Sequence, residues 1–199
     1  MPRKEEQNQE LRDARKEQIL QAALIVFARR GMVATKISDI AKEAGLSHGL
    51  VYHYFDSKDE IFSMLVKKAS NSSIEIIQKA IEHKGSPLEK LKWMTEQILN
   101  NLIDSEHTLL FLIMIQASTS DAIPNEVKEL LTRDNALSPV DCILPLFVAG
   151  QEKGEIISAN PVTLAVTYFA FIQGLAINII QWTECPIPDA NMLMKIFTK

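Results

Sequence analysis

Apolar side chains recur at intervals of three and four residues along most of the chain, which is the spacing of one face of an α-helix. Strand-like alternation is almost absent, and no Asn-Gly or Asp-Gly turn pair occurs. Three sites combine a capping residue with proline at the first helical position: Ser86-Pro87, Ser138-Pro139 and Asn160-Pro161. The pattern therefore predicts an all-α protein.

The same pattern predicts where the helices lie. We expect them at about 10–30, 37–44, 47–55, 58–84, 87–105, 106–120, 125–135, 139–153, 161–183 and 190–197. The early helices are closely spaced, whereas the later ones are longer and more apolar. This change in character predicts a small N-terminal helix-turn-helix domain at 1–56 and a larger helical domain at 57–199.

Residues 35–58 (TKISDIAKEAGLSHGLVYHYFDSK) contain two short predicted helices, and the turn between them starts with glycine. Gly45 can supply the left-handed conformation that ends the first helix. Apolar residues share one face of each helix: Ile37, Ile40, Ala41 and Ala44 in the first, Val51 and Phe55 in the second. This arrangement is typical of a helix-turn-helix, whose second helix can enter the major groove of DNA.

The outward positions of the second helix include a Tyr-His-Tyr run. Aromatic rings left in water without a partner are unusual, so Tyr52 and Tyr54 suit contacts with the DNA backbone and with thymine methyl groups. Lys58 begins the next helix, where its ammonium group and the unpaired N–H groups of the first turn both favour a phosphate.

The run GLSHGLVYHYFDSKDEIF resembles the signature of the TetR family of one-component transcriptional regulators. The matching residues are Gly45, Leu46, Ser47, Gly49, Val51, Tyr52, Tyr54, Phe55 and Lys58. With the exposed positions above, the resemblance implies a DNA-binding set of Thr35, Lys36, Ser47, His48, Gly49, Tyr52, His53, Tyr54 and Lys58. His48 stands where the family often has lysine, and Leu50 where it often has threonine, so the resemblance does not specify which bases are read.

In the larger domain a few polar residues interrupt strongly apolar runs. Core packing is the commoner role of the apolar residues, but sparse polar groups in an apolar wall are also what a small-molecule cavity requires. The TetR resemblance implies a homodimer and a pocket for a small hydrophobic inducer, walled by the helices around 87–120 and 161–183. The candidate lining residues are Trp93, His107, Phe111, Met114, Gln116, Tyr168, Phe171 and Gln173.

The segment Val162–Ile180 is nearly long enough to span a bilayer and contains no charge. Its four polar residues and the absence of a basic flank argue against a membrane span, so we expect a helix buried on all sides by protein. Pairing the helices at 139–153 and 161–183 with their symmetry mates would form a four-helix interface, as in the TetR family. The alternative is that Val162–Ile180 is the central core helix of one subunit.

Charge alone gives a misleading indication. The 21 basic and 25 acidic side chains give a formal net charge of −4, which argues weakly against a nucleic-acid binder. However, residues 1–60 contain 10 basic and 10 acidic side chains, so the whole excess (11 minus 15) lies in residues 61–199.

The charged N-terminus lacks the apolar stretch of an export signal, which predicts a cytoplasmic protein.

Residues 45–49 also fit G-x-S-x-G, the nucleophile elbow of hydrolases, but a predicted helix precedes them where that motif needs a strand. His48 and His53 are five residues apart, so they do not share a helix face as metal ligands would. We therefore expect no enzymatic activity, no metal and no cofactor.

The sequence favours a ligand-responsive repressor that a hydrophobic inducer releases from a palindromic double-stranded DNA operator. The alternative is a helical protein-interaction scaffold without DNA binding, which would leave the Tyr-His-Tyr run unexplained.

Overall fold

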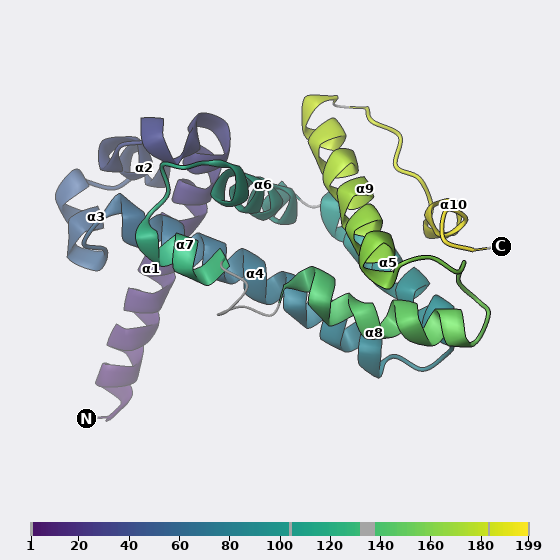
Figure 1. Ribbon diagram of the computed structural model, residues 1–199. Coiled ribbons are helices and arrows are strands. Elements are labelled where there is room, and N and C mark those ends of the chain that lie inside the picture. Colours follow the sequence, from purple (N-terminus) through teal and green to yellow (C-terminus); the bar gives the residue numbers. More distant parts are fainter. Residues whose placement is uncertain (1, 104, 132–137, 183, 199) are drawn as a thin grey trace. The chain divides into compact units, whose positions relative to one another are not determined.

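The computed structural model describes residues 2–103, 105–131, 138–182 and 184–198. These residues form helices and no strands, which confirms the predicted all-α class (Figure 1). The helices are α1 (Pro2–Ala34), α2 (Ile37–Ala44), α3 (His48–Tyr54), α4 (Lys58–Glu82), α5 (Pro87–Ile103), α6 (Ser105–Thr119), α7 (Asn125–Leu131), α8 (Pro139–Glu152), α9 (Pro161–Gln181) and α10 (Ala190–Met194). The first helix begins earlier than predicted, and positions 132–135 of the predicted seventh helix lie outside the described residues.

The chain folds into two compact units. The first contains the residues up to Ala69 together with Leu112–Leu131, and the second contains Ser70–Phe111 and the described residues from Ser138 onward. Helices α4 and α6 therefore each contribute residues to both units. The predicted functional boundary at residues 56 and 57 stays a prediction.

In the first unit, α1 packs against α2, and α2 packs against α3. The rings of Phe27 from α1 and Phe62 from α4 meet edge to face with their centroids 5.3 Å apart. The apolar faces predicted for the two short helices are buried, since Ile40 and Val51 are fully inaccessible and Phe55 nearly so. This core fixes the orientation of α3, because only one face of a helix this short can point inward.

Gly31 interrupts α1, with φ of 77° and ψ of 160°. Glycine tolerates this positive φ because it has no Cβ atom. The regular part of α1 therefore ends near Arg30, as predicted, and residues 32–34 form a separate turn that leads into α2.

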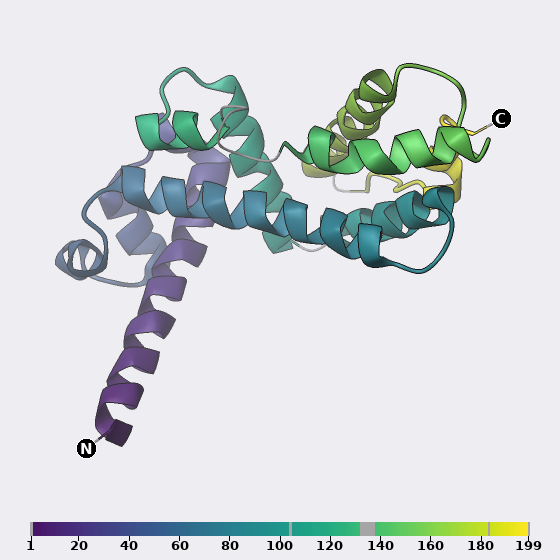
Figure 2. The ribbon, with the colours of Figure 1, turned by 60° about the horizontal axis from the view of Figure 1, so that its bottom comes forward.

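In the second unit, α8 packs against α9 and α5, and α10 packs against α5 (Figures 1 and 2). Phe147 and Tyr168 lie at the centre of the core, where both side chains are fully buried. The ring of Phe197, near the C-terminus, packs edge to face on Phe147 at 5.6 Å.

Helix α9 is only partly covered. It is long and apolar enough to cross a membrane, with a mean hydropathy of 1.7, yet only 33% of its most apolar stretch is buried in the subunit. Val162, Val166 and Ile177 are 45%, 51% and 37% exposed. One face of α9 lies in the core, where Tyr168 is fully buried, but the described residues of one chain do not bury the helix on all sides as expected.

Candidate nucleic-acid interface

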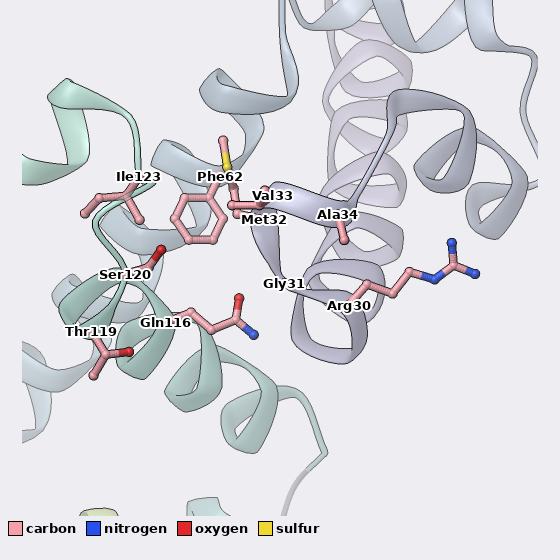
Figure 3. Close-up of a pocket in the computed structure, with 10 residues that line it drawn as sticks. All are labelled: Arg30, Gly31, Met32, Val33, Ala34, Phe62, Gln116, Thr119, Ser120 and Ile123. Atoms are coloured by element: carbon pink, nitrogen blue, oxygen red, sulfur yellow. The ribbon is translucent and has the colours of Figure 1, made fainter.

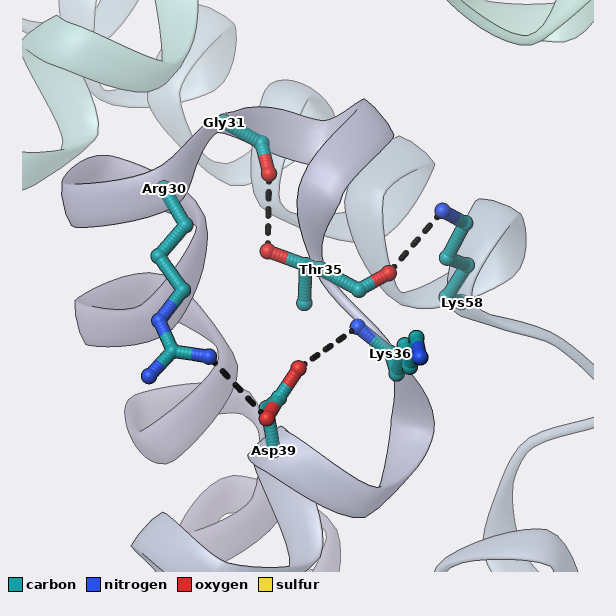
Figure 4. A network of polar contacts seen from close by, with 6 residues as sticks. All are labelled: Arg30, Gly31, Thr35, Lys36, Asp39 and Lys58. Atoms are coloured by element: carbon teal, nitrogen blue, oxygen red, sulfur yellow. Dashed lines mark hydrogen bonds and ion pairs between the residues drawn. The ribbon is translucent and has the colours of Figure 1, made fainter.

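Helix α2 is anchored at its N-terminus to α1. The backbone N–H of Lys36 donates to Oδ2 of Asp39 at 3.0 Å, and Nη1 of Arg30 lies 3.0 Å from Oδ1 of the same carboxylate (Figure 4). Asp39 thus caps the first turn of α2 and binds the last regular turn of α1. A carboxylate at this end of a helix is stabilised by the helix dipole.

The turn between α2 and α3 has the predicted chemistry. Gly45 adopts φ 67° and ψ 30°, the left-handed conformation that ends α2. Its N–H donates to the carbonyl of Lys42, and the next N–H, that of Leu46, donates to the carbonyl of Ala41. Ser47 then caps α3, because its Oγ accepts from the N–H of Leu50 at 3.2 Å. These contacts confirm a helix-turn-helix.

The two glycines of this motif make a matched test. Gly45→Ala should lower the free energy of unfolding by about 1–2 kcal/mol, because alanine is strained at a positive φ. The cost should come from the backbone alone, since an added Cβ would meet no atom within 4 Å at either glycine. Gly49→Ala, in the helical conformation of α3, should leave stability equal or raise it by up to about 1 kcal/mol. Urea unfolding measures both, and equal losses would contradict the strained turn.

Helix α3 presents a continuous polar and aromatic surface. Val51 is its buried residue, whereas Ser47, His48, Gly49, Tyr52 and His53 are exposed and Tyr54 is partly buried. The ring of His48 meets that of Tyr52 edge to face at 4.9 Å, and the ring of His53 meets that of Tyr54 at 5.1 Å. These pairs hold the outward side chains in defined positions, which lowers the entropy lost when they bind a surface.

Two residues of the predicted DNA-binding set have hydrogen-bond partners within the protein. Thr35 is buried, and its hydroxyl donates to the carbonyl of Gly31 at 2.7 Å. Nζ of Lys58 donates to the carbonyl of Thr35 at 2.9 Å (Figure 4). It also donates to the carbonyls of Met32 and Val33, at 3.0 and 3.2 Å. An ammonium group has three N–H donors, so these contacts use all of them. Lys58 therefore clamps the segment between α1 and α2 onto the start of α4, and a direct phosphate contact by either side chain stays a prediction.

The predicted ligand-binding residues are divided between the two units. Tyr168 is fully buried in the second unit, and its hydroxyl lies 3.0 Å from Oγ1 of Thr95. Trp93 is partly buried and stacks on the His83 ring at 4.8 Å. Gln173 is exposed on α9. Three partly buried residues, His107, Phe111 and Phe171, also belong to this unit, whereas Met114 and Gln116 belong to the first unit.

The Tyr168 pair gives an alkaline-pH prediction. Burial raises the pKa of the Tyr168 hydroxyl, and the hydrogen bond to Thr95 offsets this only in part. The unfolded chain releases this proton near pH 10, before the folded protein does, so stability should fall as the pH rises above about 10. In Tyr168→Phe, unfolding above pH 10 should release one proton fewer, so stability should fall less steeply with pH. The lost hydrogen bond should also lower the free energy of unfolding by about 1 kcal/mol at neutral pH. Thermal unfolding between pH 8 and 11 measures both effects, and an identical pH dependence in the variant would contradict the assignment.

Comparison with known proteins agrees with this geometry. Residues 19–65, which run from the middle of α1 to the first turns of α4, match the family of bacterial regulatory proteins called the tetR family. The chain is 30% identical over 149 residues to the fatty acid metabolism regulator protein of Bacillus subtilis, covering 74% of each chain. It is 36% identical over 78 residues to the transcriptional repressor KstR2 of Mycolicibacterium smegmatis, covering 39% of this chain and 38% of that one.

The fold extends this similarity beyond the helix-turn-helix. A TetR-family transcriptional regulator from Agrobacterium tumefaciens superposes with a TM-score of 0.78 at 19% identity, over 94% of this chain and 100% of that one. The sequence match to the Bacillus subtilis regulator covers about three quarters of both proteins and so reaches well past the DNA-binding helices. The chain belongs to the TetR family and is a DNA-binding transcriptional regulator.

Proposed function

We propose that the protein is a repressor that binds a palindromic operator as a homodimer and is released by a small hydrophobic inducer. The observation that supports DNA reading most directly is α3, whose one buried residue leaves a surface of hydroxyl, imidazole and phenol groups in solvent. Such groups bind both phosphates and base edges. The likeness to KstR2, which is named as a repressor, supports the direction of regulation.

Within this proposal the residues of the motif have three kinds of role. Ser47, His48, Gly49 and Tyr52 contact bases or the groove wall, while His53, Tyr54 and Lys36 contact the backbone. Lys58 and Thr35 act indirectly, since their contacts hold the connection that leads into α2. The operator should then be an imperfect palindrome whose half-sites lie about 34–36 Å apart, one turn of DNA.

The proposed dimer rests on the uncovered face of α9. An exposed apolar stripe on a helix of 21 residues marks an interface more often than a free surface. Helix α8 packs beside α9 and exposes Val148 at 40%, so the two helices can form a four-helix interface with a second copy. Burial in this interface would also account for the apolar residues of α9 without a membrane span. We therefore place the regulator in the cytoplasm with its DNA.

The inducer site is proposed for the second unit, where apolar side chains surround the Thr95–Tyr168 hydroxyl pair. The relative in Bacillus subtilis is named for fatty acid metabolism, which supports a hydrophobic inducer of the fatty-acid type. The runner-up function, a helical scaffold without DNA binding, explains α9 but leaves the exposed rings of α3 without a purpose.

Fluorescence anisotropy with DNA from upstream of the protein's own gene tests the proposal. The wild type should bind this DNA far more tightly than a scrambled duplex. Tyr52→Ala should weaken specific binding roughly tenfold or more, since one base contact contributes about 1–3 kcal/mol. Tyr52 is 48% exposed, so its loss should not affect folding, and Met192→Ala at a position 65% exposed on α10 is the control. Equal binding to both duplexes would favour the scaffold.

A further inference from the structure

The N-terminal turns of α1 extend beyond the other helices of the first unit, as both views show (Figures 1 and 2). Residues 7–14 are all exposed, and the first buried side chain among those described is that of Ile19. Residues 7–18, here called the overhang, form about 18 Å of helix at a rise of about 1.5 Å per residue. Their one large apolar residue, Leu11, is 70% exposed, so packing within the subunit does not account for this segment.

The charges of the overhang are separated onto two sides of the helix. Spacings of three and four residues place its basic side chains on one side and its acidic ones on another. The basic set is Arg12, Arg15 and Lys16, and the acidic set is Glu10, Asp13 and Glu17. The residues three and four positions from Arg12 are two glutamines, an arginine and a lysine, so the helix offers it no acidic neighbour. Like charges at these spacings disfavour an isolated helix, whereas a bound polyanion would stabilise them.

Two contacts show which side of the overhang faces which helix. Nζ of Lys16 lies 5.9 Å from the centre of the Phe55 ring, which ends α3, within the range of a cation–π contact. The next residue, Glu17, points to a different helix, because its Oε1 lies 2.8 Å from Nζ of Lys68 on α4. The basic side of the overhang therefore begins beside the end of α3, and the acidic side begins beside α4.

The basic side chains of the overhang have not been neutralised by the fold. No ion pair joins Arg12, Arg15 or Lys16 to a described residue, and Arg12 is fully in solvent. Arg30 gives the contrast near the other end of the same helix. It lines a cavity of about 250 Å³ (Figure 3), and its guanidinium group is paired with Asp39. The charge of Arg30 is thus used within the unit, whereas the overhang presents its positive charge outward.

We propose that the basic side of the overhang binds phosphates of the duplex DNA that flanks the half-site read by α3. This inference rests on the DNA-binding role of α3 and requires neither the repressor direction nor the inducer. The basic side begins at the end of α3 that carries His53 and Tyr54, the proposed backbone contacts, so it continues the same surface. Each DNA strand has a phosphate about every 3.4 Å along the axis, so a helix of this length can meet more than one. Such contacts add affinity without reading sequence.

Salt titration of DNA binding, followed by fluorescence anisotropy, tests the overhang. Each phosphate contact adds about 0.9 to the slope of log K against log salt, so Arg12→Gln/Lys16→Gln should lower the slope by about 1.8 per bound subunit. Binding should weaken roughly tenfold or more at about 0.1 M salt, by a similar factor for the operator and for a scrambled duplex. Arg12→Gln alone, at an exposed position, should give about half of the change in slope.

A charge-matched variant separates contact from net charge. Lys153→Gln/Lys195→Gln removes the same charge from two exposed positions of the second unit, and it should leave the slope unchanged. Duplex length gives a second readout. The wild type should bind an operator with flanking base pairs more tightly than one trimmed at the half-sites, and Arg12→Gln/Lys16→Gln should lose most of this difference.

Three results would overturn the proposal. They are an unchanged slope in overhang variants that urea unfolding shows to be folded, an equal loss of slope in the charge-matched variant, and a wild type that gains no affinity from flanking DNA. The slope is also measured on the scrambled duplex, where no operator is needed. Failure of the overhang contact is therefore distinguishable from failure of the proposed repressor function, which would appear as equal wild-type binding to both duplexes.

Discussion

Replacing Lys58 by methionine should destabilise the protein by about 2–4 kcal/mol and abolish tight operator binding. Three carbonyls would lose a charged donor at once, and each hydrogen bond to a charged group contributes about 1.5–3 kcal/mol. The site is partly solvated, so the total should fall below the simple sum. The loss would release the segment between α1 and α2, and with it the orientation of the helix-turn-helix. Urea unfolding and operator anisotropy measure the two effects.

Salt dependence separates this structural role from a phosphate contact. A lysine that binds a phosphate directly adds about 0.9 to the slope of log K against log salt, and its loss need not affect folding. Lys58→Met should instead reduce stability first. Lys67→Met on the same helix is the matched control, because the exposed pair of Lys67 with Glu126 should contribute less than about 1 kcal/mol. If Lys58→Met left the stability unchanged and reduced the salt slope, the result would favour a direct phosphate contact by Lys58.

Val166→Glu should convert the proposed dimer into monomers and lower operator affinity by about 10²–10⁴-fold. Val166 is 51% exposed in one subunit, so glutamate there leaves the subunit core intact. In a symmetric interface the two copies of the new carboxylate would be buried near each other without partners, at a cost of several kcal/mol. A monomer binds each half-site separately. It therefore loses the high effective concentration that binding of one half-site gives to the second DNA-binding domain of a dimer.

Analytical ultracentrifugation over a range of concentrations measures the effect. Met192→Glu places the same charge at a position that is 65% exposed on α10, and this control should stay as dimeric as the wild type. A dimer that survives Val166→Glu at the same concentrations would locate the interface elsewhere than on α9.

The helix positions could be predicted from the sequence because their signals are local. Asn160 caps α9 through Val162 and Thr163, and Gly45 ends α2 through a single positive φ. Neither signal depends on the rest of the chain. The early start of α1 cannot be predicted in this way, because the polar, charged residues before position 10 give no amphipathic pattern.

The roles of Lys58, Thr35 and Gln116 could not be predicted in the same way. Lys58 binds carbonyls 23 to 26 positions earlier in the chain, and Gln116 binds carbonyls 88 and 89 positions earlier. Nothing in a local pattern distinguishes such a lysine from one that faces a phosphate. Thr35 did carry one signal, since a threonine four residues after a glycine break can bond back to the freed carbonyl.

The recognition helix α3 and the uncovered face of α9 belong to different compact units. In the proposed dimer, damage to α3 would therefore spare the pairing surface, and a faulty chain would still combine with an intact one. Such a mixed dimer would have a single functional DNA-binding domain and could not bind both half-sites of a palindromic operator. In a cell that makes both kinds of chain in equal amounts, most pairs would contain a faulty partner, so a lesion in α3 should behave as a dominant-negative allele.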